Sequence, residues 1–184
     1  MKIELSRHDW KNLRSFAGSA VGLGDTVRIL VEAKSREEAE SAYAHIDGVA
    51  LLNRRLSQSA PAVASCLVQG LFSASPAART IILEILAEIA GSFDHDAMDL
   101  SAGPVTYEAC MDEVILGLPV YCEIVESGAE INDRVICIDL ILMCGLHDTR
   151  VKNRVSHTLV SVRDMEDFAA HVGLIDNSLA ELHG

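Results

Sequence analysis

Aromatic residues are scarce in this chain of 184 residues: Phe, Trp and Tyr make up 4% of it, whereas all hydrophobic residues together make up 49%. Sheet sandwiches and barrels usually carry more aromatic and β-branched residues, because these side chains pack well on a pleated surface. Alanine and other small aliphatic residues suit closely packed helices instead. The composition therefore predicts an all-α protein, and the chain is long enough for one domain with a substantial core.

Long apolar runs are absent as well. No stretch reaches the roughly 18 consecutive apolar residues of a membrane-spanning helix. The N-terminus, Met-Lys-Ile-Glu-Leu-Ser-Arg, becomes polar too early for a secretory signal peptide. The five cysteines include no Cys-x-x-Cys pair, and they lie in apolar segments where a thiol behaves as a small hydrophobe. These features favour a reducing cytoplasm over a disulfide framework or a zinc site.

Catalytic motifs are also missing. The chain has no glycine-rich phosphate loop before a lysine, no His-Glu-x-x-His and no Gly-x-Ser-x-Gly. Asp94-His95-Asp96 is the one cluster that resembles a metal site, but three adjacent residues rarely converge on a single ion. Adjacent carboxylates such as Asp112 and Glu113 point about 100° apart on a helix, so they do not share a site. We expect no cofactor, no metal and no enzymatic activity.

A strongly apolar helix is predicted from Ser75 to Gly91. Ser75 suits the N-cap and Pro76 the first helical position, while Gly91 suits the left-handed position that ends many helices. Between these ends, Glu84 and Glu88 form the only polar stripe. Neighbouring elements must cover so wide an apolar surface from several sides, so we expect a central helix.

The remaining helices are predicted from shorter signals, such as the capping box of Ser35 and Glu38 and the N-cap residue Asp25. We expect Trp10 to cover one end of the core. Asp139 stands alone in an apolar run, and an unpaired buried charge is costly, so we expect it to meet a basic side chain or backbone amides. The predicted helices span residues 6–16, 25–33, 35–46, 49–56, 61–71, 106–118, 120–127, 131–145, 149–162 and 164–182.

One pattern occurs twice, in residues 61–91 and 119–145. Each copy has a helix that begins at a proline, a short turn, and a nearly apolar helix that opens with Arg, carries an acid five residues later and ends in Gly. A degenerate N-terminal copy covers 17–48, and 148–184 forms capping helices. Such pairs are typical of an α-solenoid, in which each pair buries its apolar face against its neighbours. The prediction is a single domain, 1–184, of stacked antiparallel helix pairs.

The pattern resembles the HEAT-type helical repeats, and more narrowly it is similar to small bacterial HEAT-like proteins. The matching pieces are Trp10, the helix pair of 61–91, and a hydrophilic segment before the Tyr107-Glu108-Ala109 helix that ends at Pro119. Such proteins often occur beside polymorphic toxins, and some are the cognate immunity proteins. The resemblance covers roughly residues 10–150 and implies a protein that binds a toxin.

Charge is distributed unevenly along the chain. Residues 1–92 hold ten basic and ten acidic side chains, whereas 93–184 hold five basic and seventeen acidic ones, which accounts for the whole net charge of −12. Within 93–139, Arg134 is the only Lys or Arg among eleven acids. This segment is either a solvated surface kept for solubility or a docking face for a basic partner. Nucleic acid is disfavoured, because binding phosphates requires clustered Lys and Arg.

We expect a cytoplasmic immunity protein that blocks a toxin by direct binding. Nucleases expose Lys and Arg to hold phosphates, so a nuclease toxin is the favoured partner. The alternatives are a scaffold or regulatory adaptor, and an enzyme on a HEAT-like frame such as a bilin lyase or a DNA-base glycosylase, although a glycosylase would need a basic concave face. The expected toxin-binding face comprises acids and two aromatic anchors: Asp94, Asp96, Asp99, Glu108, Asp112, Glu123, Glu126, Glu130, Tyr107 and Tyr121.

Overall fold

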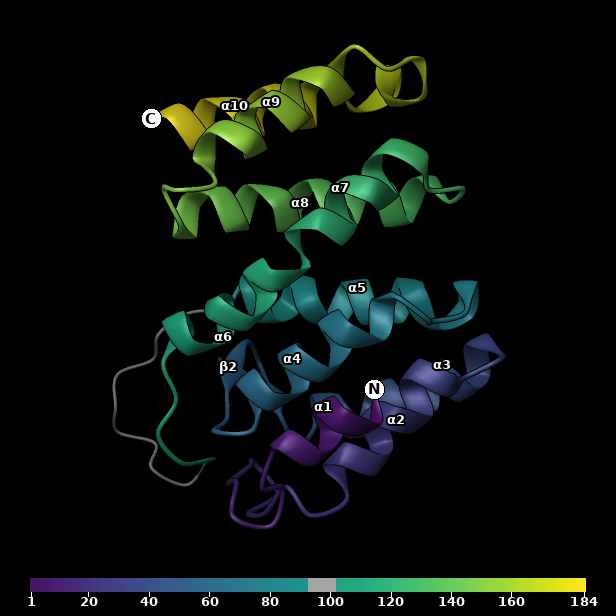
Figure 1. The fold of residues 1–184 in the computed structure, drawn as a ribbon, viewed down its shortest axis with the longest axis vertical. Coiled ribbons are helices and arrows are strands. Elements are labelled where there is room, and N and C mark those ends of the chain that lie inside the picture. Colours follow the sequence, from purple (N-terminus) through teal and green to yellow (C-terminus); the bar gives the residue numbers. More distant parts are fainter. Residues whose placement is uncertain (93–101) are drawn as a thin grey trace. The chain divides into compact units, whose positions relative to one another are not determined.

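The computed structural model describes residues 1–92 and 102–184 (Figure 1). Most of these residues lie in helices and very few in strands, which confirms the all-α class. They form two compact units, Met1–Leu116 (unit 1) and Gly117–Gly184 (unit 2). One domain over 1–184 and the stacking of its helix pairs into an α-solenoid stay predictions. No helix in the described part of the chain combines the length and the apolar character that crossing a membrane requires.

Unit 1 is built around its fifth helix. Its elements are α1 (Lys2–Arg7), α2 (Leu23–Glu32), α3 (Arg36–Asp47), β1 (Leu51–Leu52), β2 (Arg55–Leu56), α4 (Ala60–Leu71), α5 (Pro76–Ala90) and α6 (Tyr107–Val114). Helix α5 contacts α2, α3, α4 and α6, and its aliphatic side chains between Ile81 and Ile89 are buried. Glu84 and Glu88 stay half-exposed, and Glu88 accepts a 2.8 Å hydrogen bond from the Tyr43 hydroxyl. The predicted central helix is therefore confirmed within this unit.

The predicted helix starts of α3 and α5 are confirmed by their hydrogen bonds. The Ser35 side chain accepts from the Glu38 amide at 3.2 Å, and the Glu38 carboxylate accepts from the Ser35 amide at 3.3 Å. At the start of α5, Ser75 Oγ accepts from the Ala78 amide at 3.2 Å. Gly91 ends α5, but its φ is −88°, so the predicted left-handed conformation is wrong. Its amide still bonds the Ala87 carbonyl at 2.8 Å, as in a continuing helical turn.

The predicted helix over residues 6–16 is wrong. Helix α1 ends at Arg7, and turns and extended backbone occupy the chain up to Gly22, which begins α2 with a φ of 87° in place of Asp25. The Trp10 indole N–H donates to the Leu5 carbonyl at 2.9 Å. A Cβ at Gly24 would lie 2.8 Å from Trp10 Nε1. This ring therefore covers the start of α2, an arrangement that needs a bent chain rather than a continuous helix.

Residues 51–56 form a β-hairpin, so the helix predicted over 49–56 is also wrong. Leu51 pairs with Leu56 and Leu52 with Arg55, and the two turn residues have left-handed φ values of 52° (Asn53) and 61°. Two consecutive turn residues with left-handed φ define a type I′ turn, whose twist matches that of the flanking strands. The second turn residue, Arg54, donates to the Gly91 carbonyl at the C-terminus of α5, where a cation is favourable. Tertiary contacts of this kind select the hairpin over a helix.

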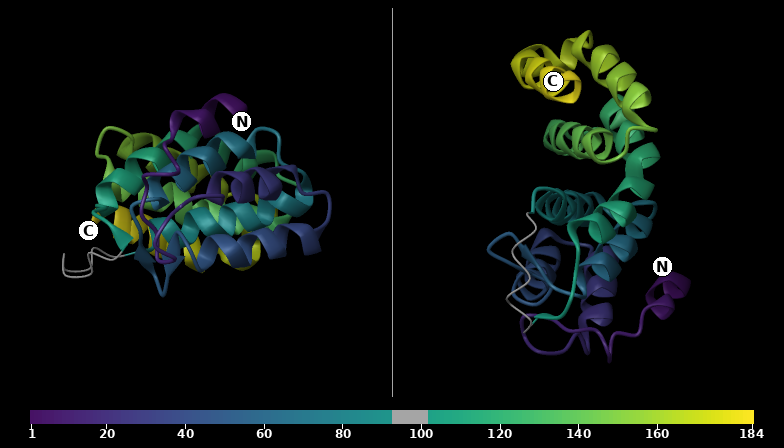
Figure 2. Two further views of the ribbon diagram at one scale, coloured as in Figure 1. Left: turned by 90° about the horizontal axis from the view of Figure 1, so that it is seen from below. Right: turned by 90° about the vertical axis from the view of Figure 1, so that its left-hand side faces the viewer.

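Unit 2 has α8 at its centre. Its elements are α7 (Leu118–Ser127), α8 (Ile131–His147), α9 (Lys152–Arg163), the 3-10 segment η3 (Glu166–His171) and α10 (Val172–His183); the 3-10 turn η2 (Ile115–Gly117) precedes α7. Helix α8 packs against α7, α9 and α10, and α9 lies beside α10 (Figures 1 and 2). The helix predicted over 164–182 begins instead as η3, because the fully buried Phe168 anchors that segment in the core.

Helix α8 approaches α9 and α10 closely at Gly145. A Cβ at this position would lie 2.8 Å from Leu182 Cδ1 and 2.9 Å from Val155 Cγ1, which is closer than real Cβ contacts. Glycine is therefore required here for packing rather than for backbone freedom. In contrast, a Cβ at Gly173 in α10 would meet nothing within 4 Å.

We predict that Gly145→Ala lowers the free energy of unfolding by about 1–3 kcal/mol, because the added methyl overpacks the contact with α9 and α10. Gly173→Ala is the matched control in the same unit and should leave stability unchanged or raise it by up to about 1 kcal/mol, since alanine favours helix. Urea unfolding followed by far-UV circular dichroism measures both. Equal effects of the two substitutions would contradict the close approach at Gly145.

Candidate functional site

Two exposed carboxylates lie on the outer side of α7, and a third stands at the N-cap of α8. Glu123, Glu126 and Glu130, called here the α7 acidic face, are exposed, whereas Ile124 and Val125 on the other side of α7 are buried. Residues three positions apart share one side of a helix, which places Glu123 and Glu126 together, whereas Glu130 follows the extended residue Gly128 and is the N-cap of α8. The side chains predicted to face outward from α7, Glu123 and Glu126, therefore do so, and Glu130 adds an exposed carboxylate just after the end of that helix.

The one basic residue of 93–139 does not neutralise this face, because Arg134 is 7% exposed. Its Nε donates to the Val125 carbonyl at 2.8 Å, and its Nη1 pairs with the Asp167 carboxylate at 2.6 Å. Its Nη2 contacts Met165 Sδ at 3.7 Å, and the guanidinium lies 4.6 Å from the centre of the Phe168 ring. The positive charge of the segment is thus used to join α7, α8 and η3 inside unit 2.

A second pair of carboxylates lies in unit 1. Glu108 and Asp112, called here the α6 acidic face, are one turn apart on α6 and exposed. The structure brings the predicted acids together within each unit, as these two faces. Asp94, Asp96 and Asp99, also predicted for the binding face, lie outside the described residues.

The predicted aromatic anchors have other roles. Tyr121 is 0% exposed and belongs to the core of unit 2, so its prediction as a contact residue is wrong. The reason is its place on the buried side of α7, where it packs over Gly117. Tyr107 is half-buried, and its hydroxyl donates to the Ala90 carbonyl at 2.8 Å, which ties the start of α6 to the end of α5.

Asp139 departs from expectation too. Its side chain is exposed on α8 and makes no hydrogen bond or ion pair with a described residue, so the predicted partner is wrong. Water reaches the carboxylate and removes the need for a basic partner. The surrounding protein still withdraws part of its hydration, and this partial burial raises the pKa of Asp139 above the ordinary value of 3.8.

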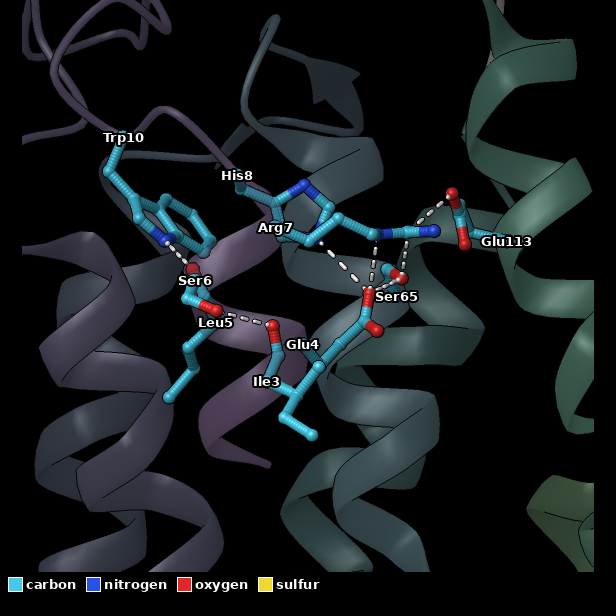
Figure 3. A network of polar contacts seen from close by, with 9 residues as sticks. All are labelled: Ile3, Glu4, Leu5, Ser6, Arg7, His8, Trp10, Ser65 and Glu113. Carbon is cyan, nitrogen blue, oxygen red and sulfur yellow. Dashed lines mark hydrogen bonds and ion pairs between the residues drawn. The ribbon is translucent and has the colours of Figure 1, made fainter.

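A polar cluster that the sequence did not reveal, called here the α1 cluster, holds α1 against α4 and α6 (Figure 3). One oxygen of Glu4 receives bonds from Ser65 Oγ at 2.6 Å, Arg7 Nε at 2.9 Å and His8 Nε2 at 3.3 Å. Burial acts to raise the pKa of Glu4, but these three partners outweigh it and lower that pKa. Arg7 also donates to Ser65 at 2.7 Å and to Glu113 at 3.1 Å. The spacing of Glu4, Arg7 and His8 on one helical side was the available signal.

A hollow of about 140 Å³ lies beside this cluster in unit 1. Phe72, at the end of α4, and Leu116, in η2, line it and are 67% and 64% exposed. Glu113 also lines it, and the Glu113 Oε2 atom is buried without a hydrogen-bond partner. Two exposed apolar side chains and an incompletely bonded carboxylate thus meet at one small depression.

The titratable groups of the described residues hold helices together and show no arrangement for nucleophilic attack. Burial raises the pKa of both the Cys66 and the Cys144 thiol to about 12, so neither is a thiolate at neutral pH. Ser65 and His8 bond the same oxygen of Glu4, so His8 does not activate Ser65 as a base would. Among residues 1–92 and 102–184, no three His, Cys, Asp or Glu residues are placed to hold a metal ion.

Comparison with protein-family models, with curated proteins and with solved structures gave no match. The resemblance to HEAT-like immunity proteins therefore stays a prediction, and the function rests on the surfaces described above.

We predict an asymmetric response to breaking the Arg134–Asp167 pair. Arg134→Met should lower the free energy of unfolding by about 3 kcal/mol, since it leaves the buried Val125 carbonyl without its donor. Asp167→Asn should cost about 1 kcal/mol, because the amide oxygen can still accept a hydrogen bond from the guanidinium and the position is 67% exposed. Thermal unfolding followed by circular dichroism separates the two, and comparable losses would refute the inward role of Arg134.

Asp139→Asn should stabilise the protein at neutral pH. A carboxyl whose pKa is raised on folding destabilises the native state once ionised, so stability falls as pH rises from 3.8 through the raised pKa. The variant should therefore unfold at higher urea concentration than the unsubstituted protein at about pH 7, and the difference should vanish near pH 3. Glu126→Gln, at an exposed position on α7, is the control. A gain that persists unchanged at low pH would contradict this assignment.

Proposed function

We propose that this chain is an immunity protein that neutralises a toxin by binding a basic surface of it, the toxin being a nuclease. The observation that carries the proposal is the inward orientation of Arg134, the only basic residue of 93–139. Glu108 on α6 and Glu123 and Glu126 on α7 therefore face solvent without an Arg or Lys side chain from their own segment among them.

Such carboxylates favour a partner that presents Lys and Arg. A nuclease displays these residues to hold the phosphates of its substrate, so an acidic protein surface competes for the same groups. Long-range attraction speeds the encounter, and contacts that lose their water on binding then determine how long the complex lasts. This mechanism needs no catalytic group and no cofactor in the immunity protein.

The first experiment identifies the partner and its contact. A carbodiimide joins a carboxylate directly to a lysine amine only where the two form an ion pair, so treating source cells couples the acidic faces to their partner. Mass spectrometry should find lysines of one basic protein joined to Glu123, Glu126 or Glu130, or to Glu108 or Asp112. Coupling exclusively to acids of residues 1–92 would refute the proposed surface.

Depletion of the chain distinguishes a toxin inhibitor from a scaffold or adaptor. For an immunity protein, loss of the chain should stop growth, and removal of the gene for the cross-linked partner should restore it. A scaffold or regulatory adaptor has no toxic partner to restrain, so partner removal should not rescue the cells. If the cells are not rescued, the acidic faces serve a binding function other than toxin inhibition.

Charge reversal should abolish binding by the acidic faces. We predict that the quadruple variant Glu108→Lys, Glu123→Lys, Glu126→Lys and Glu130→Lys weakens partner affinity about 100-fold or more at physiological salt, largely through slower association. The matched control makes the same change of net charge at exposed acids outside 93–139: Glu37→Lys, Asp164→Lys, Glu166→Lys and Glu181→Lys. Surface plasmon resonance at two salt concentrations gives both rate constants. Equal losses in the two variants would attribute the effect to net charge alone.

A further inference from the structure

The hollow between Phe72 and Leu116 carries a more specific inference. Large apolar side chains exposed at 67% and 64% gain free energy when a partner removes them from water, and here both border the same depression. Contacts that dominate protein interfaces are characteristically apolar pockets that take one anchoring side chain of the partner. The geometry of this hollow matches that description.

We propose that this hollow receives one arginine or lysine side chain of the protein partner. The aliphatic stem would pack between Phe72 and Leu116, and the charged end would meet the carboxylate of Glu113. This inference rests on the proposed function, since it names the point at which a basic partner is anchored, and it adds a contact that the acidic faces do not include.

The size of the hollow limits its occupant. Pockets for small-molecule ligands usually measure about 300–1,000 Å³, whereas this one is about 140 Å³. That volume suits a single side chain. Long cationic side chains are well adapted to such a place, because their methylene stems pack on apolar surface while the charged end reaches a polar group or water.

The charges around the hollow favour a cation. Two carboxylates, Glu4 and Glu113, face it, and Arg7 alone bridges both of them with an ion pair to each. Glu113 Oε1 is 3.1 Å from Arg7 Nη2, while Oε2 has no donor. The last torsion of a glutamate has a broad energy minimum, so the carboxylate can turn part of the way at little cost. Glu113 can therefore keep Arg7 on one oxygen and present the other to an incoming donor, which relieves an unsatisfied buried acceptor.

The direct test uses N-acetyl-arginine methylamide as the probe and its citrulline counterpart, which has nearly the same shape without the charge, as the ligand control. Two-dimensional NMR of the full chain should show saturable shifts at Ser65, Glu113 and Leu116. The arginine probe should bind about fivefold more tightly than the citrulline probe. Equal affinities, or no saturable shift at these residues up to about 20 mM probe, would overturn the proposal.

Substitutions separate the apolar and the ionic contribution. Glu113→Gln should bring the two probes to equal affinity, and Leu116→Ala should weaken both about threefold without touching the α1 cluster. Ile29→Ala, at another exposed aliphatic residue of unit 1, is the matched control and should change neither affinity. Arginine binding that survives both hollow substitutions unchanged would place the probe elsewhere and refute the anchor.

Sedimentation of the unsubstituted chain tests the competing occupant, a second copy of this protein. Self-association that Glu113→Gln and Leu116→Ala abolish would overturn the proposal in favour of that occupant, whereas a monomer supports it. The probe experiment requires no knowledge of the toxin, so its result is independent of the charge-reversal test. If the probe binds but charge reversal leaves partner affinity unchanged, the anchor is supported and the acidic faces are refuted. If the probe does not bind but charge reversal weakens the partner, the acidic faces are supported and the anchor is refuted.

Discussion

The need to cover two predominantly apolar helices determines how each unit packs. Helices α5 and α8 have aliphatic side chains on almost every side, and each buried Leu or Ile contributes about 1.5–3 kcal/mol relative to an exposed one. Exposing such surfaces to water is unfavourable. Four helices therefore pack around α5 in unit 1, and three pack around α8 in unit 2. The polar residues are consequently carried by the covering helices, and the exposed acids on α6 and α7 follow from the same constraint.

Arg134 shows how packing and electrostatics are connected. A buried guanidinium loses its hydration, and it is retained only where hydrogen bonds and a counter-ion replace the water. Here the Val125 carbonyl, Asp167 and the face of Phe168 supply those contacts. The same arrangement removes the one cation of 93–139 from the surface, so stability of unit 2 and acidity of its α7 side have a common origin. The planar guanidinium holds its N–H donors in a fixed arrangement, so Arg134 also joins η3 to α7.

Local signals in the sequence predicted the long helices well and the short elements poorly. The caps at Ser35 and Ser75 act through atoms within four residues, so a single segment contains all the information they need. The hairpin after α3 depends on Arg54 reaching Gly91, and the bend after α1 depends on Trp10 lying over Gly24. Such contacts join residues distant in sequence, and no local pattern encodes them.

In the candidate site, too, the features set by local pattern could be predicted from the sequence, and those set by distant contacts could not. Exposure of Glu108, Glu123 and Glu126 follows from helical periodicity, which a sequence displays directly. The burial of Tyr121 was missed because a tyrosine suits either an interface or a core, and its neighbours decide which. The α1 cluster and the hollow at Phe72 require three helices to meet, so they became visible only with the fold.

The buried cysteines provide a chemical probe of local opening in each unit. Cys66 and Cys110 lie in the core of unit 1, Cys137 and Cys144 in the core of unit 2, and all four are inaccessible to solvent. An alkylating reagent reaches them only while the surrounding helices are separated. The order in which the four sulfurs are alkylated therefore reports how often each unit opens locally, and no substitution is needed to measure it.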